Sequence, residues 1–248
     1  MIRNNFVAFT VALCVMSPLA LQAAEGKPHW AYDGEHGPKH WGKLSPDYVL
    51  CEAGVNQSPV DIVSALETDL PAIVMDYGSD SLNIINNGHT AQVNVEPGSF
   101  LRVENEQYEL KQFHIHVPSE HRIDGEQFLL EVHYVHQNAE GELAVVAALH
   151  REGEDHPILT RYVGLIPEEV GAPVPFKVSL HDLPIVTLDK EYYRYNGSLT
   201  TPPCSEGVRW FVLKTIRTVT LKRREIFNKL IGDDARDSQP INARIILQ

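Results

Sequence analysis

Apolar and polar residues alternate in short runs along most of the chain, with the period of two that is typical of β-strands. Gly, Pro, Asn or Asp separates most of these runs, as expected for strands joined by turns. The pattern therefore predicts a strand-dominated chain. The strands are expected at residues 73–77, 82–86, 91–95, 100–103, 107–117, 127–136, 143–149, 186–188, 208–218 and 241–247.

Helical spacing of apolar residues is confined to two segments. Residues 157–166 follow Asp155, a residue type that caps helix N-termini, and residues 221–231 end at a glycine. Residues 25–50 carry many aromatic rings among Gly and Pro without periodicity, so we expect a coil held against the sheet by these rings. The sequence has no linker, repeat or low-complexity tract. Residues 25–248 are therefore expected to form one mainly-β (α+β) domain with short peripheral helices.

Residues 1–24 differ from the rest in composition. Arg3 is their only charge, residues 6–21 are nearly all apolar, and the small residues Ala23 and Ala24 follow. This order is typical of a secretory signal peptide that is removed near its small residues. A membrane anchor is disfavoured, because polar residues interrupt a segment already shorter than the ~20 residues that span a bilayer. The mature chain is thus expected to be periplasmic or secreted, without a stable membrane span.

The charge balance limits the partners. The 248 residues include 33 acidic and 21 basic ones, which gives a formal net charge of −12 at pH 7. Loss of Arg3 with the signal would leave the mature chain one unit more acidic. An acidic surface argues against nucleic acid or an anionic membrane as a partner, but it does not exclude a small uncharged substrate.

Two cysteines, Cys51 and Cys204, remain once the signal is removed. An even number of cysteines in an exported chain indicates a disulfide, and the alternative is two separate buried thiols. Closing a loop of about 150 residues would stabilise the fold by roughly 5 kcal/mol in the chain-entropy model. Such a bridge would tie the chain near residues 196–203 to the N-terminal third.

Three histidines in two strand-like runs have the pattern of a metal site. His114 and His116 lie two residues apart and share a strand face, and His133 comes level with them if the runs are antiparallel neighbours. Gln112 and Glu131 each stand two residues before a histidine, where an oxygen can accept from the second ring nitrogen of a metal ligand. One His-x-His alone would indicate only a polar sheet face. The combined pattern favours a catalytic zinc site with three protein ligands and one open position.

Six short motifs follow one another along the chain: Gln-Ser-Pro-Val-Asp-Ile (57–62), Asn-Asn-Gly-His (86–89), Gln-Phe-His-Ile-His (112–116), Ser-Glu-His (119–121), Glu-Val-His-Tyr-Val-His (131–136) and Ser-Leu-Thr-Thr-Pro-Pro-Cys (198–204). Their sequences and order resemble those of the α-class carbonic anhydrases. The resemblance runs from about His29 to Arg244, nearly the whole mature chain. Together the motifs are highly specific, whereas the His-x-His alone is not.

The resemblance implies a large, twisted, mostly antiparallel central sheet, with one zinc ion held by the three histidines at the base of a cleft. It also implies that the Thr200 hydroxyl accepts a hydrogen bond from a zinc-bound hydroxide and donates one to the carboxylate of Glu120. Thr201 would line the bicarbonate position. Without the resemblance, these threonines would be assigned to an ordinary polar loop.

An apolar wall beside the zinc is implied for CO2. Val135 lies on the same strand face as His133. Considered alone, the apolar residues of this wall would be assigned to the core, so their role depends on the resemblance. The wall consists of Val135, Val145, Leu199, Val208 and Trp210.

Proton release is implied to use His89. Imidazole, with a pKa near 6.5, is the side chain best suited to carry protons at neutral pH. Tyr32, Asn87 and Gln92 would order the intervening water. The family often has Asn at the position of Gln92, so this chain departs from the pattern there. An exposed histidine in a turn is the alternative interpretation of His89.

The resemblance thus implies a zinc lyase that interconverts CO2 and bicarbonate, in which zinc lowers the pKa of bound water from 15.7 to about 7. A second hypothesis is a non-catalytic binding module of the same family, although such relatives usually lack one or more zinc histidines. A third is a zinc hydrolase. The chain has no His-Glu-x-x-His motif for a peptidase, while an esterase side activity is compatible with the first hypothesis. The sequence leaves monomer and homodimer open.

Overall fold

The structure, a computed structural model, describes residues 28–183, 185 and 191–248. The predicted signal segment and the predicted strand 186–188 lie outside these residues. The strands are β1 (Asp61–Ile62), β2 (Val74–Tyr77), β3 (Ser81–Asn86), β4 (Ala91–Val95), β5 (Ser99–Val103), β6 (Glu106–His116), β7 (Arg122–Ile123), β8 (Glu126–Gln127), β9 (Leu130–Gln137), β10 (Leu143–Glu152), β11 (Val174–Pro175), β12 (Tyr192–Ser198), β13 (Glu206–Leu213) and β14 (Arg217–Val219).

Helices in the described residues are few and mostly short, as the sequence predicts. No helix in this part of the chain combines the length and apolar composition needed to cross a bilayer. The α-helices are α1 (Trp41–Leu44), α2 (Leu50–Ala53), α3 (Pro157–Val163) and α5 (Leu221–Ile231), and the 3-10 turns are η1 (Gly34–His36), η2 (Pro46–Tyr48) and η3 (Leu180–Asp182).

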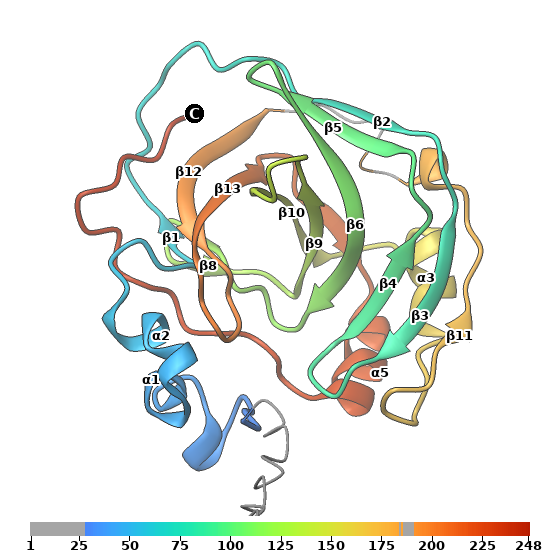
Figure 1. Ribbon diagram of the computed structural model, residues 1–248. Coiled ribbons are helices and arrows are strands. Elements are labelled where there is room, and N and C mark those ends of the chain that lie inside the picture. Colours follow the sequence, from blue (N-terminus) through green and yellow to red (C-terminus); the bar gives the residue numbers. More distant parts are fainter. Residues whose placement is uncertain (1–27, 184, 186–190) are drawn as a thin grey trace, which may run out of the picture.

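One large curved sheet dominates the molecule (Figure 1). Its central order is β11-β3-β4-β6-β9-β10-β13-β12, with β5 also paired to β6, β2 to β5 and β14 to β10. Within this sheet the described strand pairs are antiparallel, except those of β10 with β13 and β14, which are parallel. A second, small sheet contains β1, β7 and β8. The predicted fold class, a large and mostly antiparallel sheet with peripheral helices, is confirmed.

Alternation along the strands divides the buried core between the two faces of the sheet. On β10, Val146 and Ala148 belong to a cluster that also contains Tyr162 of α3 and Phe227 of α5, which we call the helix-side core. The intervening Val145, like Ala147, belongs to a separate cluster, the site-side core. Because successive residues of a strand point to opposite faces, β9, β10, β12 and β13 contribute side chains to both clusters.

Two strand predictions at the C-terminal end are wrong. The segment 208–218 is divided, because a bend at residues 214–215 separates β13 from β14. Residues 241–247 form no strand, since only Leu247 pairs, in isolated bridges. A turn between residues 241 and 244 breaks the extended backbone, so alternating side chains there do not reflect sheet pairing.

Three further predictions of local structure differ from the observed structure. Strand β12 was not predicted, although its tyrosines are good strand formers. Residues 34–53 form short helical turns instead of a coil, and Trp30, Tyr32 and Trp41 pack edge to face on one another. His156, not Asp155, caps α3. The Asp155 carboxylate instead accepts from the backbone and side chain of Thr220 at the start of α5.

Candidate metal centre and active site

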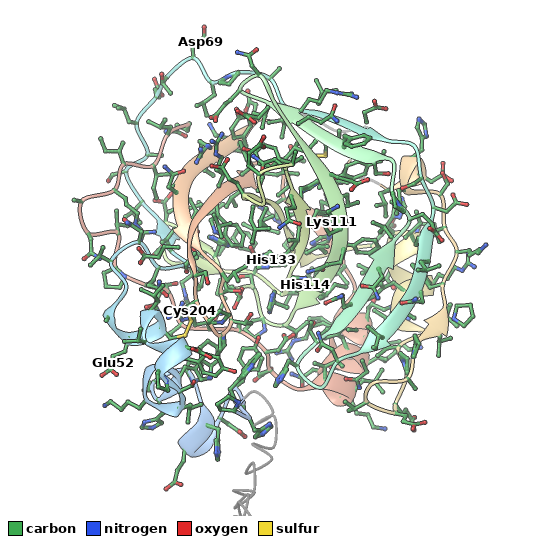
Figure 2. All side chains as sticks on the ribbon, in the orientation of Figure 1. Glu52, Asp69, Lys111, His114, His133 and Cys204 are labelled. Atoms are coloured by element: carbon green, nitrogen blue, oxygen red, sulfur yellow. A yellow bond between two sulfur atoms is a disulfide. The ribbon has the colours of Figure 1, made fainter. Side chains whose placement is uncertain are left out.

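Three predicted ligands converge from two neighbouring strands on the site-side face. The antiparallel register of β6 and β9 sets His114 directly opposite His133, and His116 lies one pleat further along β6. One nitrogen from each ring lies within 4.8 Å of the other two. Figure 2 shows the labelled His114 and His133 close together inside the curve of the sheet.

The outer nitrogens of two rings fix where their protons lie. His114 Nδ1 donates to Gln112 Oε1 at 2.8 Å, and His116 Nδ1 donates to the backbone carbonyl of Asp234 at 2.7 Å. Both Nε2 atoms therefore carry lone pairs, although they lie only 3.1 Å apart. Two acceptors cannot bond to each other, but two ligands on a tetrahedral zinc lie about 3.3 Å apart. The donor set therefore fits a zinc ion.

His133 is oriented the other way round. Its Nε2 donates to Glu131 Oε1 at 2.8 Å, so Nδ1 is the nitrogen left for a metal. Glu131 also lies 2.6 Å from His121 Nδ1, so these three residues form a second cluster of metal-ligating side chains. Their separations are those of hydrogen bonds, with Glu131 accepting from both rings. This second cluster supports the first and is not itself a metal site.

Glu131 is the inner end of a buried series of hydrogen bonds that the sequence did not reveal. His121 Nε2 accepts from the Tyr195 hydroxyl at 2.7 Å, which in turn lies 2.9 Å from Ser58 Oγ. Burial alone would raise the pKa of Glu131, but His121 and His133 outweigh it and hold the pKa well below its usual value. A charged carboxylate thus orients His133. In the sequence, only the polar pair Glu120-His121 hinted at this hydrogen-bond series, and nothing around Tyr195 did.

Glu120 directs one free oxygen toward the histidines. Its Oε1 accepts from the backbone N–H of Arg236 at 3.0 Å, while Oε2 has no hydrogen-bond partner among the described residues and lies 3.5 Å from His116 Nε2. Burial, followed by repulsion from Glu131, raises the pKa of Glu120 to about 8, while the backbone N–H of Arg236 and the nearby hydroxyl of buried Thr200 lower it. A cation beside Oε2 would offset the cost of burial and return this carboxyl group to its charged form.

Asp234 is a second acidic residue that sequence reasoning missed. Besides accepting from His116 through its carbonyl, it accepts the Val117 amide on Oδ1 at 2.6 Å. Burial raises the pKa of its carboxyl group to about 7, although the nearby His116 lowers it. Asp234 and Arg236 come from the segment after α5, which has no periodicity, so nothing in the sequence indicated their approach to His116 and Glu120.

The apolar wall predicted from the resemblance is assembled in the site-side core. Val145 on β10 pairs in register with Val135 on β9 and with Trp210 on β13. The Trp210 ring lies 4.9 Å from that of His133, centroid to centroid. Val208 is buried in the same cluster and Leu199 packs against it. The metal candidate thus borders an apolar surface on one side.

Thr201, predicted to line the substrate position, lies half-buried in the turn after β12. Its carbonyl accepts from the backbone N–H of Cys204. Cys204 and Cys51 form a disulfide across a separation of 153 residues, as predicted from their number. Figure 2 shows the Cys204 sulfur beside α1 and α2. The bridge therefore anchors the Thr200–Thr201 turn to the N-terminal segment.

His89 lies in the turn between β3 and β4 and stacks on Trp30. The two rings are 3.6 Å apart, centroid to centroid, and nearly parallel at 9°. Partial burial, followed by the neighbouring His29, lowers the pKa of His89. Asn87 holds the turn itself, because its Oδ1 accepts from the backbone N–H groups of His89 and Thr90.

The other two predicted water-ordering residues lie nearer the sheet. Gln92 on β4 pairs in register with His114 and donates to Asn94 Oδ1 at 2.7 Å. Tyr32 is half-buried, and its pKa is held well above its usual value by burial and then by the carboxylates of Asp234 and Glu120. Tyr32 thus lies within electrostatic reach of the site and remains a neutral donor at physiological pH.

Replacing Trp30 with alanine is expected to raise the pKa of His89. The stacked ring removes one face of the imidazole from water and so disfavours its charged form. NMR titration of the His89 ring protons would measure the change. His29→Asn should also raise this pKa, by a smaller amount. A His89 pKa that stays unchanged or falls in the Trp30 variant would contradict this account.

A large curved sheet with a three-histidine centre defines this chain as a mainly-β protein with a candidate metal centre. The family description "Eukaryotic-type carbonic anhydrase" matches residues 36–247, so the chain belongs to this family. The chain is 42% identical over 240 residues to a carbonic anhydrase of Pectobacterium atrosepticum, covering 96% of this chain and 98% of that one. It is 39% identical to a carbonic anhydrase of Neisseria gonorrhoeae, with 96% and 95% covered.

A solved structure supports the same assignment. The α-carbonic anhydrase of Thermovibrio ammonificans, in complex with the inhibitor sulfanilamide, superposes with a TM-score of 0.86 at 40% identity. The match covers 90% of this chain and 100% of that one. The family identified from short motifs in the sequence is thereby confirmed.

Proposed function

We propose that this protein catalyses the reversible hydration of CO2 to bicarbonate and a proton, with one zinc ion held by His114, His116 and His133. The observation that carries the proposal is the distance of 3.1 Å between the Nε2 atoms of His114 and His116. Both Nε2 atoms carry lone pairs, because the proton of each ring lies on Nδ1 and is donated to another acceptor. When bound there, zinc would supply hydroxide at neutral pH by lowering the pKa of water to about 7. Membership of the family supports the proposal.

The ligands and their partners tune the charge of the site. Three neutral imidazoles leave the full double charge of a zinc ion in place, whereas thiolate ligands would cancel it. Glu131 and Gln112 keep two of the rings in the required tautomers by accepting from the nitrogens that face away from the site. The Asp234 carbonyl does the same for His116.

Thr200 and Glu120 are proposed to orient the nucleophile. Glu120 Oε2 has no other acceptor role among the described residues, so the Thr200 hydroxyl can donate to it. The Thr200 oxygen then presents only lone pairs toward the attacking water, which fixes the direction of its proton. Thr201, in the same turn, would contact bicarbonate.

The apolar wall is proposed to position CO2. CO2 has no net charge and no hydrogen-bond donor, so a surface such as Val135, Val145 and Trp210 can hold it without ordering water around it. Leu199 and Val208 complete this surface. Its position next to the His133 ring brings the carbon close to the nucleophile.

His89→Ala is expected to slow CO2 hydration about 10-fold or more in weakly buffered solution, because an imidazole no longer carries protons from the site to bulk water. Added imidazole should restore the rate. Stopped-flow kinetics at low and high buffer concentration would measure both effects. His181→Ala, at a histidine 75% exposed on η3, is the control and should behave like the wild type. Equal rates for wild type and His89→Ala in weak buffer would remove His89 from this role.

The test of the proposed function is stopped-flow CO2 hydration on protein of known metal content. As purified, the chain should hold about one zinc and turn over CO2; stripping the metal should abolish turnover, and adding zinc should restore it. A wild-type chain with neither zinc affinity nor turnover would refute the proposal and favour the non-catalytic binding module.

We also infer that the chain is exported and acts outside the cytoplasm. The disulfide between Cys51 and Cys204 supports this, since such bonds persist in oxidising compartments. Mass spectrometry of protein from the periplasm or medium should give a mature N-terminus near Ala23 or Ala24. Recovery of the intact chain from the cytoplasm alone would contradict export.

A further inference from the structure

A cavity of about 580 Å³ lies on the helix-side face of the sheet, opposite the three histidines. Its sheet wall includes Phe113 and Ile115 of β6, which alternate along the strand with the predicted metal ligands His114 and His116. Its other wall is α3, through Ile158 and Leu159. Figure 1 shows α3 on the outer side of the sheet. The volume is within the range of small-molecule sites, roughly 300–1,000 Å³.

The cavity has an apolar body and one cationic end. Val132 of β9 adds to the apolar lining. At the other end, Arg217 of β14 pairs in register with His150 of β10, so both side chains lie on the same face. Tyr134 of β9 lines the same region. This division suits a ligand with an apolar tail and a polar head.

The Arg217 guanidinium lacks a counter-ion within the described residues. Its Nη2 atom is buried and has no hydrogen-bond partner there, and no carboxylate in this part of the chain lies within ion-pair distance of it. Asp155, which lines the same cavity, is already engaged by Thr220 and Arg223. A buried cationic N–H without an acceptor costs free energy, and an anion in the cavity would offset that cost.

The neighbours of Arg217 cannot neutralise it. Burial raises the pKa of Tyr134 to about 12, so it is a neutral hydroxyl at physiological pH. Burial, with Arg217 as the next cause, lowers the pKa of His150 to about 3, so this imidazole is neutral as well. The remaining acids on the lining, Glu154 and Asp182, are exposed at the rim. The cationic end therefore keeps one unbalanced positive charge beside two neutral hydrogen-bonding groups.

We propose that this cavity binds a small organic carboxylate with an apolar tail, its head on Arg217 and its tail against Phe113, Val132 and Leu159. A carboxylate matches the guanidinium in charge and can accept two of its N–H groups side by side. Tyr134 and His150 would provide further polar contacts. The inference does not depend on zinc or on CO2 hydration, because the cavity lies across the sheet from the histidine site.

The test is an NMR titration with octanoate, in the presence of saturating sulfanilamide to keep the carboxylate away from the histidine site. The methyl signals of Ile115, Val132 and Leu159 are expected to shift. Octan-1-ol, with the same tail and no charge, should bind at least about 10-fold more weakly, because it cannot form the charge-assisted bonds. Arg217→Gln should weaken octanoate binding by a similar factor.

Two further variants keep the test decisive. Arg122→Gln removes a guanidinium on β7, outside the cavity, and should leave octanoate binding unchanged. Leu159→Trp should fill the cavity and abolish binding even if Arg217→Gln proves unstable. The proposal is overturned if octanoate and octan-1-ol bind equally, if Arg217→Gln or Leu159→Trp binds octanoate like the wild type, or if no shift occurs at these methyl groups up to millimolar octanoate.

Discussion

Replacing His133 with alanine is expected to abolish zinc binding and to reduce CO2 hydration by at least about 1,000-fold. The variant loses the one ligand on β9, and the two nitrogens left on β6 form an incomplete site. The variant also removes one of the two donors to Glu131 Oε1, and alanine provides no donor in its place. Zinc per chain, measured by atomic emission, and stopped-flow CO2 hydration would record both losses.

His136→Ala is the matched control for this experiment. His136 lies three residues further along β9, is equally buried and bonds to the Tyr77 hydroxyl at 2.6 Å. Its loss should cost about 1–3 kcal/mol of stability by leaving that hydroxyl unpaired. Zinc content and turnover per folded chain should nevertheless stay at wild-type levels. Equal loss of zinc in both variants would mean that damage to β9, and not a missing ligand, explains the His133 result.

Removal of the disulfide is expected to lower the free energy of unfolding by about 5 kcal/mol. The bridge closes a loop with a separation of 153 residues, and the chain-entropy model gives this value for a loop of that length. For a chain of this size, the melting temperature should fall by about 10–20 °C. The C51S/C204S double variant, melted beside the wild type, would show the difference.

Loss of the bridge is also expected to affect the active site, and the same double variant can show this. Arg236 donates to the Cys51 carbonyl, and Gln57 donates to the Cys204 carbonyl, so both halves of the bridge join the network that positions Glu120. We therefore expect slower turnover as well as lower stability. Wild type melted in a strong reductant is the control and should match the double variant. A melting temperature within about 2 °C of the oxidised wild type would contradict the stabilising role.

Much of the sheet could be predicted because its strands carry strict alternation. β4 has the bounds predicted from the apolar pattern, and the long strands β6, β9 and β10 differ from their predicted bounds by only a few residues at their ends. Alternation failed where it was not caused by pairing. Residues 241–247 alternate in the sequence but meet a turn, and β12 pairs fully although its Gly and Asn obscured it.

The residues of the candidate site also fall into those that alternation predicts and those that it does not. His114, His116 and His133 could be found because the period of two puts them on one face, and Gln112 and Glu131 follow the same rule. Residues that reach the site from irregular segments could not. Asp234 reaches His116 on β6, and Arg236 reaches Glu120 just after β6, each from more than 100 residues away along the chain, and no local pattern records such contacts.

The sequence by itself determined a strand-rich chain with three histidines on one sheet face and one pair of cysteines for a disulfide, because side-chain alternation and cysteine number can be read from the sequence alone. Only the tertiary structure decided which nitrogen of each ring is left for a metal, since that depends on which nitrogen meets an acceptor: the side-chain amide of Gln112, the carbonyl of Asp234 or the carboxylate of Glu131. It also decided that the opposite face holds a cavity with an unpaired Arg217, because a cavity results from how α3 packs on the sheet.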